Sequence, residues 1–196
     1  MYQLTTDPVV SYERSLFDAL KFVLEGGVLD QVEYRGLAEV EGRTAVLLLS
    51  TGINSLSRTG FKEIRKIAAN AGVPIYAIGI GELEYIRIEP HLGSFQRMTF
   101  LQAQNHLKTF SSESGGHFYS IRFIGALGNI LESITAMLRF QYTLGYRTRW
   151  NEDLPAKRQI KVLVDLDGDQ HPDNDRLDLN YRRYCYLADS GKGGNG

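Results

Sequence analysis

Cysteine is nearly absent from this chain of 196 residues, and the single copy, Cys185, excludes an intramolecular disulfide and any cysteine cluster for a metal within one chain. Long apolar runs are also missing, since no stretch approaches the roughly 20 consecutive apolar residues that span a bilayer. Residues 1–8 have neither the basic segment nor the apolar core of a signal peptide. The sequence as written therefore predicts a soluble chain that carries no export signal.

The chain also has no large excess of positive or of negative charge. The 22 Lys plus Arg and 23 Asp plus Glu residues give a formal net charge of −1, and no basic cluster runs longer than Arg182 and Arg183. Nucleic acids and anionic membranes are bound by clustered positive charge. We therefore expect neither nucleic acid nor a membrane as a partner.

Signatures of catalysis and of cofactor binding are absent too. The chain contains no Gly-x-Ser-x-Gly nucleophile motif, and Gly79-Ile-Gly81 lacks the third glycine and the prompt helix of a dinucleotide-binding fingerprint. The four histidines, at positions 91, 106, 117 and 171, show no metal-ligand spacing. The sequence thus predicts a protein that is not an enzyme and holds no cofactor.

What is present is an apolar stretch around which the chain is arranged, residues 42–54, reading G-R-T-A-V-L-L-L-S-T-G-I-N. Residues 44–49 favour β structure and are too short for a free-standing helix. Because apolar and polar residues do not alternate there, we expect a buried strand of a parallel sheet with helices on both faces. Binding sites of such sheets lie beyond the carboxyl ends of the strands. The candidate ligand-binding residues are therefore Ser50, Thr51, Gly52 and Asn54.

Hydrophobic periodicity predicts the elements around this strand. Helices are expected from Asp7-Pro8 to the glycine pair at 26–27 and over residues 55–70, 100–114 and 125–139. Within them, we expect inward-facing Leu101, Leu107 and Phe110 in the third helix, and a buried stripe of Leu127, Ile130, Leu131, Ile134 and Leu138 in the fourth. Further strands are expected at 73–81 and 117–120, the first joined to the central strand by a right-handed parallel crossover.

Two connections and the C-terminal part complete the prediction. Residues 29–37 are expected to contain a short helical turn, and residues 82–99 to form an irregular loop that offers Arg87, Glu89, His91 and Arg97 as contact residues. Alternation predicts strands at 140–146, 159–166 and 177–187. The last two should form an antiparallel hairpin that closes on residues 167–175, and residues 190–196 a flexible tail.

Several segments in this order resemble the von Willebrand factor type A domain, in particular the bacterial group of VWFA-related Acidobacterial domain proteins. They are S-L-F-D-A-L at 15–20, G-R-T-A-V-L-L-L-S at 42–50, A-G-V-P-I-Y-A-I-G-I-G at 71–81, E-S-G-G at 113–116, Q-Y-T-L-G-Y at 141–146 and R-R-Y-C-Y at 182–186. The resemblance implies a doubly wound α/β module, usually exported, that binds other proteins rather than catalysing a reaction. It implies an extracellular or periplasmic location.

The metal site of that family is degenerate in this chain. Many members hold a divalent ion through an Asp-x-Ser-x-Ser loop, a Thr and an Asp; the motif does not occur here, and Arg14 and Thr51 stand at the positions that look like the Thr and the Asp. Ser50, Thr51 and Asn54 offer only neutral oxygens, whereas a hard divalent cation prefers anionic or neutral oxygens, about six in all. We therefore predict no metal at this loop.

The family's first strand is also missing, which would leave the strand at residues 44–49 at an edge of the sheet. An exposed apolar edge is a hazard for aggregation or a site for pairing with another chain. We expect this chain to be the back part of a longer protein, with a second chain, residues 2–5 or residues 29–41 as alternative covers of the edge.

An acidic run at residues 165–175 is the other stretch with possible chemistry. Carboxylates at positions one, three, five and nine match an EF-hand-like calcium loop, but Gln170 replaces the glycine of position six and Arg176 the glutamate of position twelve. The candidate calcium ligands are Asp165, Asp167, Asp169 and Asp173. The alternative is a solvated hairpin loop, which is often rich in Asp, Asn, Gly and Pro.

Together these patterns predict an α/β fold with a doubly wound, mostly parallel sheet, helices on both faces and a C-terminal antiparallel β-hairpin extension. The expected division is a type A-like domain at 1–147, the extension packed on it at 148–189 and the tail at 190–196. The predicted function is a non-catalytic module that binds another protein or associates with itself through the sheet edge. The alternatives are a calcium-stabilised adhesion segment and an enzyme with its site at the carboxyl end of the sheet.

Overall fold

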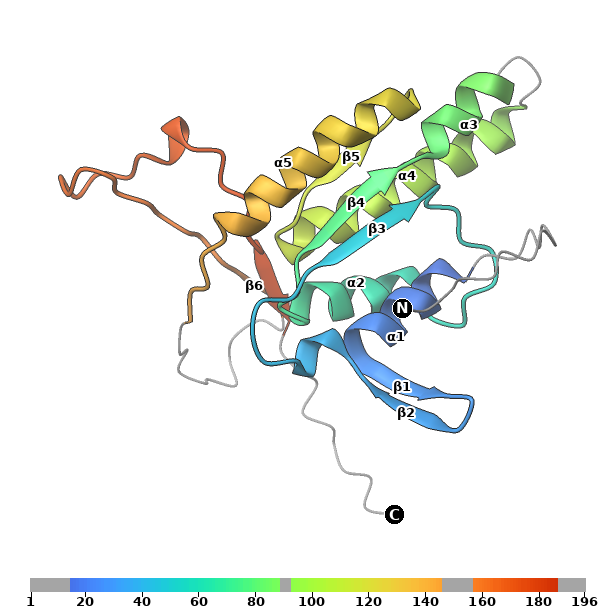
Figure 1. Cartoon of the computed structure of the whole chain (residues 1–196), viewed down its shortest axis with the longest axis horizontal. Coiled ribbons are helices and arrows are strands. Elements are labelled where there is room, and N and C mark those ends of the chain that lie inside the picture. Colours follow the sequence, from blue (N-terminus) through green and yellow to red (C-terminus); the bar gives the residue numbers. More distant parts are fainter. Residues whose placement is uncertain (1–14, 89–92, 146–156, 187–196) are drawn as a thin grey trace.

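Five apolar or small residues, Ile75–Gly79, form strand β4 at the centre of a parallel sheet in the computed structural model (Figure 1). The structure describes residues 15–88, 93–145 and 157–186, apart from the side chains of Glu84, Arg87 and Ile88. Strand β3 (Val46–Ser50) pairs with one edge of β4 and strand β5 (Phe118–Ser120) with the other, both in parallel. The predicted parallel crossover is confirmed.

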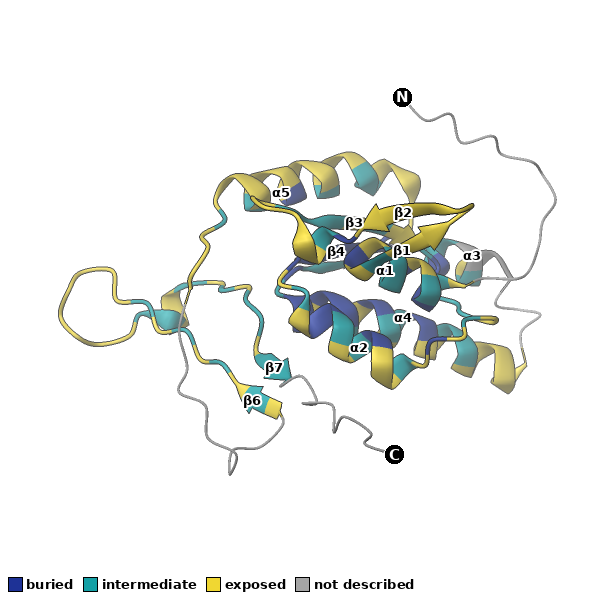
Figure 2. Cartoon of the chain, turned by 90° about the horizontal axis from the view of Figure 1, so that it is seen from below, coloured by how far each residue is buried: buried dark blue, intermediate teal, exposed yellow. Residues whose placement is uncertain are grey.

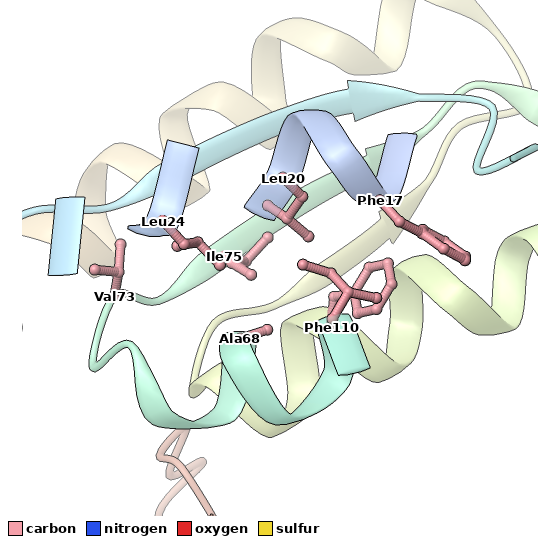
Figure 3. Close-up of a cluster of buried hydrophobic side chains, with 8 residues drawn as sticks. Phe17, Leu20, Leu24, Ala68, Val73, Ile75 and Phe110 are labelled. Atoms are coloured by element: carbon pink, nitrogen blue, oxygen red, sulfur yellow. The ribbon is translucent and has the colours of Figure 1, made fainter. Parts of the chain in front are cut away.

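Helices cover this sheet on both faces (Figure 2). Helices α1 (Leu16–Glu25), α2 (Phe61–Asn70) and α4 (Ser94–Ser114) lie on one face, and α5 (Leu127–Arg139) lies on the other. The larger core cluster joins the first face to the sheet (Figure 3), and its buried residues are Phe17, Leu20, Leu24, Ile64, Ala68, Val73, Ile75 and Phe110. A mixed α/β fold with a parallel sheet flanked by helices is thus confirmed.

The segment after α1 is an antiparallel hairpin, which corrects the expected helical turn. Strands β1 (Gly26–Leu29) and β2 (Val32–Arg35) pair with each other, and only the 3-10 turn η1 (Leu37–Glu39) is helical. Asp30 and Gln31 both have positive φ, 50° and 65°. This is the backbone of a two-residue turn whose twist matches the flanking strands. The sequence has no glycine at the turn to signal it.

The expected loop at residues 82–99 is wrong for its described part. Residues Gly81–Ile88 form helix α3, and α4 begins at Ser94 instead of residue 100. The rings of Tyr85 and Phe100 lie 5.4 Å apart and pack the two helices together, a tertiary contact that loop length does not reveal. Of the expected contact residues, Glu89, His91 and the side chain of Arg87 lie outside the described part of the chain, and Arg97 is exposed on α4.

Other helix boundaries and faces differ from the prediction as well. Helix α2 begins at Phe61 rather than at residue 55, and the part of the first predicted helix before residue 15 lies outside the described residues. Leu107 and Phe110 are buried as predicted, but Leu101 is 67% exposed although its neighbour Ala103 is buried. Leu101 precedes Phe110 by nine positions, which at 3.6 residues per turn places the two side chains on opposite sides of α4. On α5, Ile134 is buried, whereas Leu131 and Leu138 are exposed.

The C-terminal strands are shorter than predicted. Strands β6 (Lys157–Gln159) and β7 (Tyr184–Tyr186) pair antiparallel, followed inward by extended chain and the turn η4 (Asn174–Arg176). One reason is that the side-chain amide of Asn174 bonds to the Val162 carbonyl and the Val164 amide, where a strand would otherwise pair. The strand predicted at 140–146 is wrong, since residues 140–145 form none; residue 146 and the tail at 190–196 lie outside the described residues.

Candidate functional site

The free edge of β3 is the most unusual surface of the sheet. The order β3-β4-β5 leaves β3 with a partner on one side only among the described residues. Leu47 is 53% and Leu49 54% exposed, whereas Val46 and Leu48 pack against the core under α1. The expectation of a strand buried on both faces is therefore wrong, and the expectation of an exposed apolar edge is confirmed for the described chain.

The strand register explains why these two leucines are uncovered. Leu47 lies beside Tyr76 and Leu49 beside Ile78, and side chains at paired positions of parallel strands point to the same face. Tyr76 and Ile78 are buried against Ile134 of α5. On this face of the sheet, helix α5 therefore covers the side chains of β4 but leaves those of β3 exposed.

A shallow hollow follows the exposed side of α5. It has a volume of about 440 Å³ and is lined by Leu131, Glu132, Thr135, Ala136, Arg139 and Phe140. On a helical wheel, Leu131 and Leu138 lie on the opposite side of Ile134 from Met137. Because Met137 contacts the Tyr119 hydroxyl of β5, this arrangement directs Leu131 and Leu138 toward β3. The part of this sheet face that α5 leaves uncovered therefore lies between exposed leucines of β3 and exposed leucines of α5.

The loop after β3 holds the residues that sequence reasoning selected. Ser50 Oγ accepts a hydrogen bond from the Gly52 amide at 3.0 Å, and Thr51 Oγ1 accepts one from the Ile53 amide at 3.5 Å. Gly52 has φ of 80°, and a Cβ there would lie 2.3 Å from the Ala103 carbonyl oxygen, so only glycine fits against α4. These side chains stabilise the turn that leaves the strand.

Asn54 joins the same loop to the start of α1. Its Oδ1 accepts hydrogen bonds from the Phe17 amide at 3.2 Å and from the Ser57 hydroxyl at 2.6 Å. The Asp18 carboxylate accepts the amides of Arg58 and Thr59, both at 2.8 Å. Hydrogen bonds from the Thr59 side chain and from these two amides lower the pKa of Asp18. The loop is therefore fixed to the first turn of α1, where helix N–H groups need acceptors.

Sequence reasoning missed His106, whose ring lies beside this loop. The ring on α4 lies 4.6 Å from the ring of Phe61 on α2 and 5.2 Å from that of Phe17 on α1. It bonds to the Gly52 backbone, and burial lowers its pKa. The position of His106 at helical spacing from Phe110 was the only available signal, and it does not distinguish a packed histidine from an exposed one.

At the carboxyl ends of β4 and β5, one carboxylate is engaged by two partners. Glu82 accepts hydrogen bonds from the Ser120 hydroxyl and from Arg122 Nε, both at 2.6 Å. The Ser120 hydroxyl and then Arg122 lower the pKa of Glu82. This arrangement keeps Glu82 ionised and joins α3 to the end of β5.

The structure brings together three of the four candidate calcium ligands. Asp165, Asp167 and Asp173 each present a carboxylate oxygen within 4.8 Å of the others, and Asp169 is not part of this group. Asp165 also accepts the amides of Gly168 at 2.7 Å and Gln170 at 2.8 Å, and these bonds lower its pKa. The carboxylates thus organise the loop by themselves and converge at one point.

Comparisons of the chain with protein-family models, with curated proteins and with solved structures find no match. None of the helices in the described residues is long and apolar enough to cross a membrane. The site must therefore be interpreted from its own geometry.

Proposed function

We propose that the chain is a non-catalytic protein-binding or structural module whose binding surface is the free edge of β3. The observation that carries this proposal is the exposure of Leu47 and Leu49 on a strand that contains no charged residue. An unpaired edge offers backbone N–H and C=O groups to an added strand, and natural edges are usually protected by charge, proline or a bulge. Strand β3 has neither a charge nor a proline.

The resemblance to von Willebrand factor type A domains supports the same proposal, because members of that family bind other proteins. The proposal includes a degenerate metal site in the loop at residues 50–54. The side-chain oxygens of Ser50, Thr51 and Asn54 are neutral and already accept hydrogen bonds from the protein. By the same resemblance, we propose an extracellular or periplasmic place of action and another protein, or a second copy of this chain, as the partner.

Replacing both leucines with lysine tests the proposal. Since Leu47 and Leu49 are more than half exposed, the double variant L47K/L49K should fold, while the two charges should oppose an added strand. The wild-type chain is expected to grow beyond its monomer mass of 22.1 kDa as its concentration rises, measured by light scattering after size-exclusion chromatography. The double variant is expected to stay monomeric.

The matched control is Phe95→Lys, which removes an exposed apolar side chain on α4, the helix that lies on the opposite face of the sheet from α5 (Figure 2). If the wild type is monomeric at all concentrations, the partner is a different protein. It should then be retained from an extract of the source by immobilised wild type and by F95K, and lost with L47K/L49K. Association or retention that is equal in all three proteins would contradict the proposal.

A second candidate is a calcium-stabilised adhesion segment, favoured by the convergence of Asp165, Asp167 and Asp173. Calcium takes six to eight oxygen ligands at about 2.3–2.6 Å, so one ion could bridge oxygens this close together. A rise of the thermal unfolding midpoint in Ca²⁺ relative to EDTA tests this candidate.

A further inference from the structure

His106 occupies the point where three helices and the loop after β3 meet. Its ring lies among the rings of Phe17, Phe61 and Phe110, at 5.2, 4.6 and 6.5 Å between centroids. Its Nδ1 atom is buried and makes no hydrogen bond among the described residues. A neutral imidazole can place its unprotonated ring nitrogen among apolar rings without a hydrogen bond. A protonated imidazole has a second N–H donor and a positive charge, and burying both without partners costs free energy.

The charged groups on the surrounding elements do not compensate such a charge. They are Asp18, Lys21 and Glu25 on α1, Arg58 in the loop, Lys62, Glu63, Arg65 and Lys66 on α2, and Arg97, Lys108 and Glu113 on α4. Asp18 accepts two loop amides, Lys21 pairs with Glu63 at 2.6 Å, and Arg65 pairs with Glu113. The titration of His106 is shifted by burial, with an opposing hydrogen bond to Gly52, and none of these charges contributes.

We propose that His106 makes the contact between α1, α2 and the loop after β3 sensitive to acid, so that protonation of its ring opens this contact while the centre of the sheet stays folded. The proposal stands independently of the function of the β3 edge. It has a consequence for that edge, because α1 lies over Val46 and Leu48 in the core cluster. Opening of α1 would expose the second face of β3.

The pH range follows from the direction of the shift. Burial lowers the pKa of His106 below its ordinary value of 6.5. The open contact, in which the ring is exposed, therefore takes up the proton first as the pH falls. The closed contact is fully stable above about pH 6.5 and loses up to tenfold in its closing constant for each pH unit below that value.

Amide hydrogen exchange, corrected for the intrinsic pH dependence of the reaction, measures this opening. Between pH 7.5 and pH 5.5 we expect protection of the Phe17, Arg58 and Thr59 amides, which bond across the contact, to fall severalfold, up to about tenfold. Protection of the Ala77 amide, which bonds to His117 within the sheet, should stay constant. Asp18 remains ionised over this range because its pKa is lowered.

Substitutions at two histidines, His106 and His171, decide whether His106 causes the opening. His106→Phe keeps an aromatic ring but cannot titrate, so its protection should not depend on pH; His106→Gln serves the same purpose if the phenylalanine variant does not fold. His171→Gln removes an exposed histidine and should respond as the wild type does. An unchanged wild type, a response that persists without His106, or an equal loss of protection at Ala77 would each overturn the proposal.

Discussion

At the scale of single residues, the ion pair between Arg65 and Glu113 is the most buried charged contact among those of the described chain. The guanidinium of Arg65 on α2 binds both carboxylate oxygens of Glu113, with Nε to Oε2 at 2.6 Å. The Glu113 side chain is only 9% exposed. A bidentate pair of this kind fixes the angle between two helices, and removal of one partner leaves the other without compensation.

The variant Glu113→Gln should therefore destabilise the chain. We expect a loss of about 1–3 kcal/mol in the free energy of unfolding, measured by urea denaturation at pH 7, because a charge-assisted bond is replaced by a neutral one. The exposed pair Lys21–Glu63 provides the control. Since its side chains are 39% and 52% exposed, Glu63→Gln should cost well under about 1 kcal/mol. Equal losses in the two variants would contradict the distinction between the pairs.

At the scale of elements, the end of α4 determines where the C-terminal segment lies. Gly115 caps the helix with φ of 88°, in the left-handed region. A Cβ at this position would lie 2.8 Å from the Arg182 amide nitrogen. The same segment is fixed to the end of α2, where Asn70 bonds to both backbone groups of Tyr186 and Arg182 bonds to the Ala69 carbonyl.

Gly115→Ala should consequently loosen both the helix end and the docked segment. We expect a destabilisation of about 1–2 kcal/mol from the left-handed backbone alone, and more from the close approach to Arg182, measured by thermal unfolding. Gly128→Ala in α5 is the matched control, because no atom of the described residues lies within 4 Å of the added Cβ. It should stabilise the chain by about 0.5–1 kcal/mol. A stabilising G115A would show that α4 does not end in this left-handed cap.

The same scale shows how far local patterns predict an element. The glycines at 26 and 115 end helices as expected, because helix termination is a local event. The turn at Asp30 and Gln31 and the pairing of α3 with α4 were missed, since neither depends on a residue type that signals it. The apolar run at 46–49 predicted a strand correctly but gave the wrong burial, because periodicity does not reveal which neighbours are present.

At the scale of the whole molecule, calcium binding to the Asp loop should appear as a change in global stability. A ligand at 100 times its dissociation constant adds about 2.7 kcal/mol, which shifts the unfolding midpoint of a chain of this size by roughly 5–10 °C. If the loop is a site, millimolar Ca²⁺ should produce such a rise over EDTA. Asp167→Asn should abolish it, while Asp169→Asn, outside the converging group, should preserve it.

An unchanged midpoint in Ca²⁺ would reject this site and leave the loop as a solvated turn held by its own hydrogen bonds. A rise in Mg²⁺ that persists in Asp167→Asn would contradict the proposal of a degenerate metal site in the loop at residues 50–54. The two loops are distinguishable because only an ion bound at the Asp loop would be lost in Asp167→Asn.

The sequence by itself determined the parallel strands and the helices between them, because these follow from local periodicity and residue type. Only the tertiary structure decided that Leu47 and Leu49 are exposed, that three of the four candidate calcium ligands converge, and that His106 lies among aromatic rings. Each of these depends on which distant segment covers a given face. That information resides in the packing of α1, α4 and α5 on the sheet, and a single stretch of sequence does not contain it.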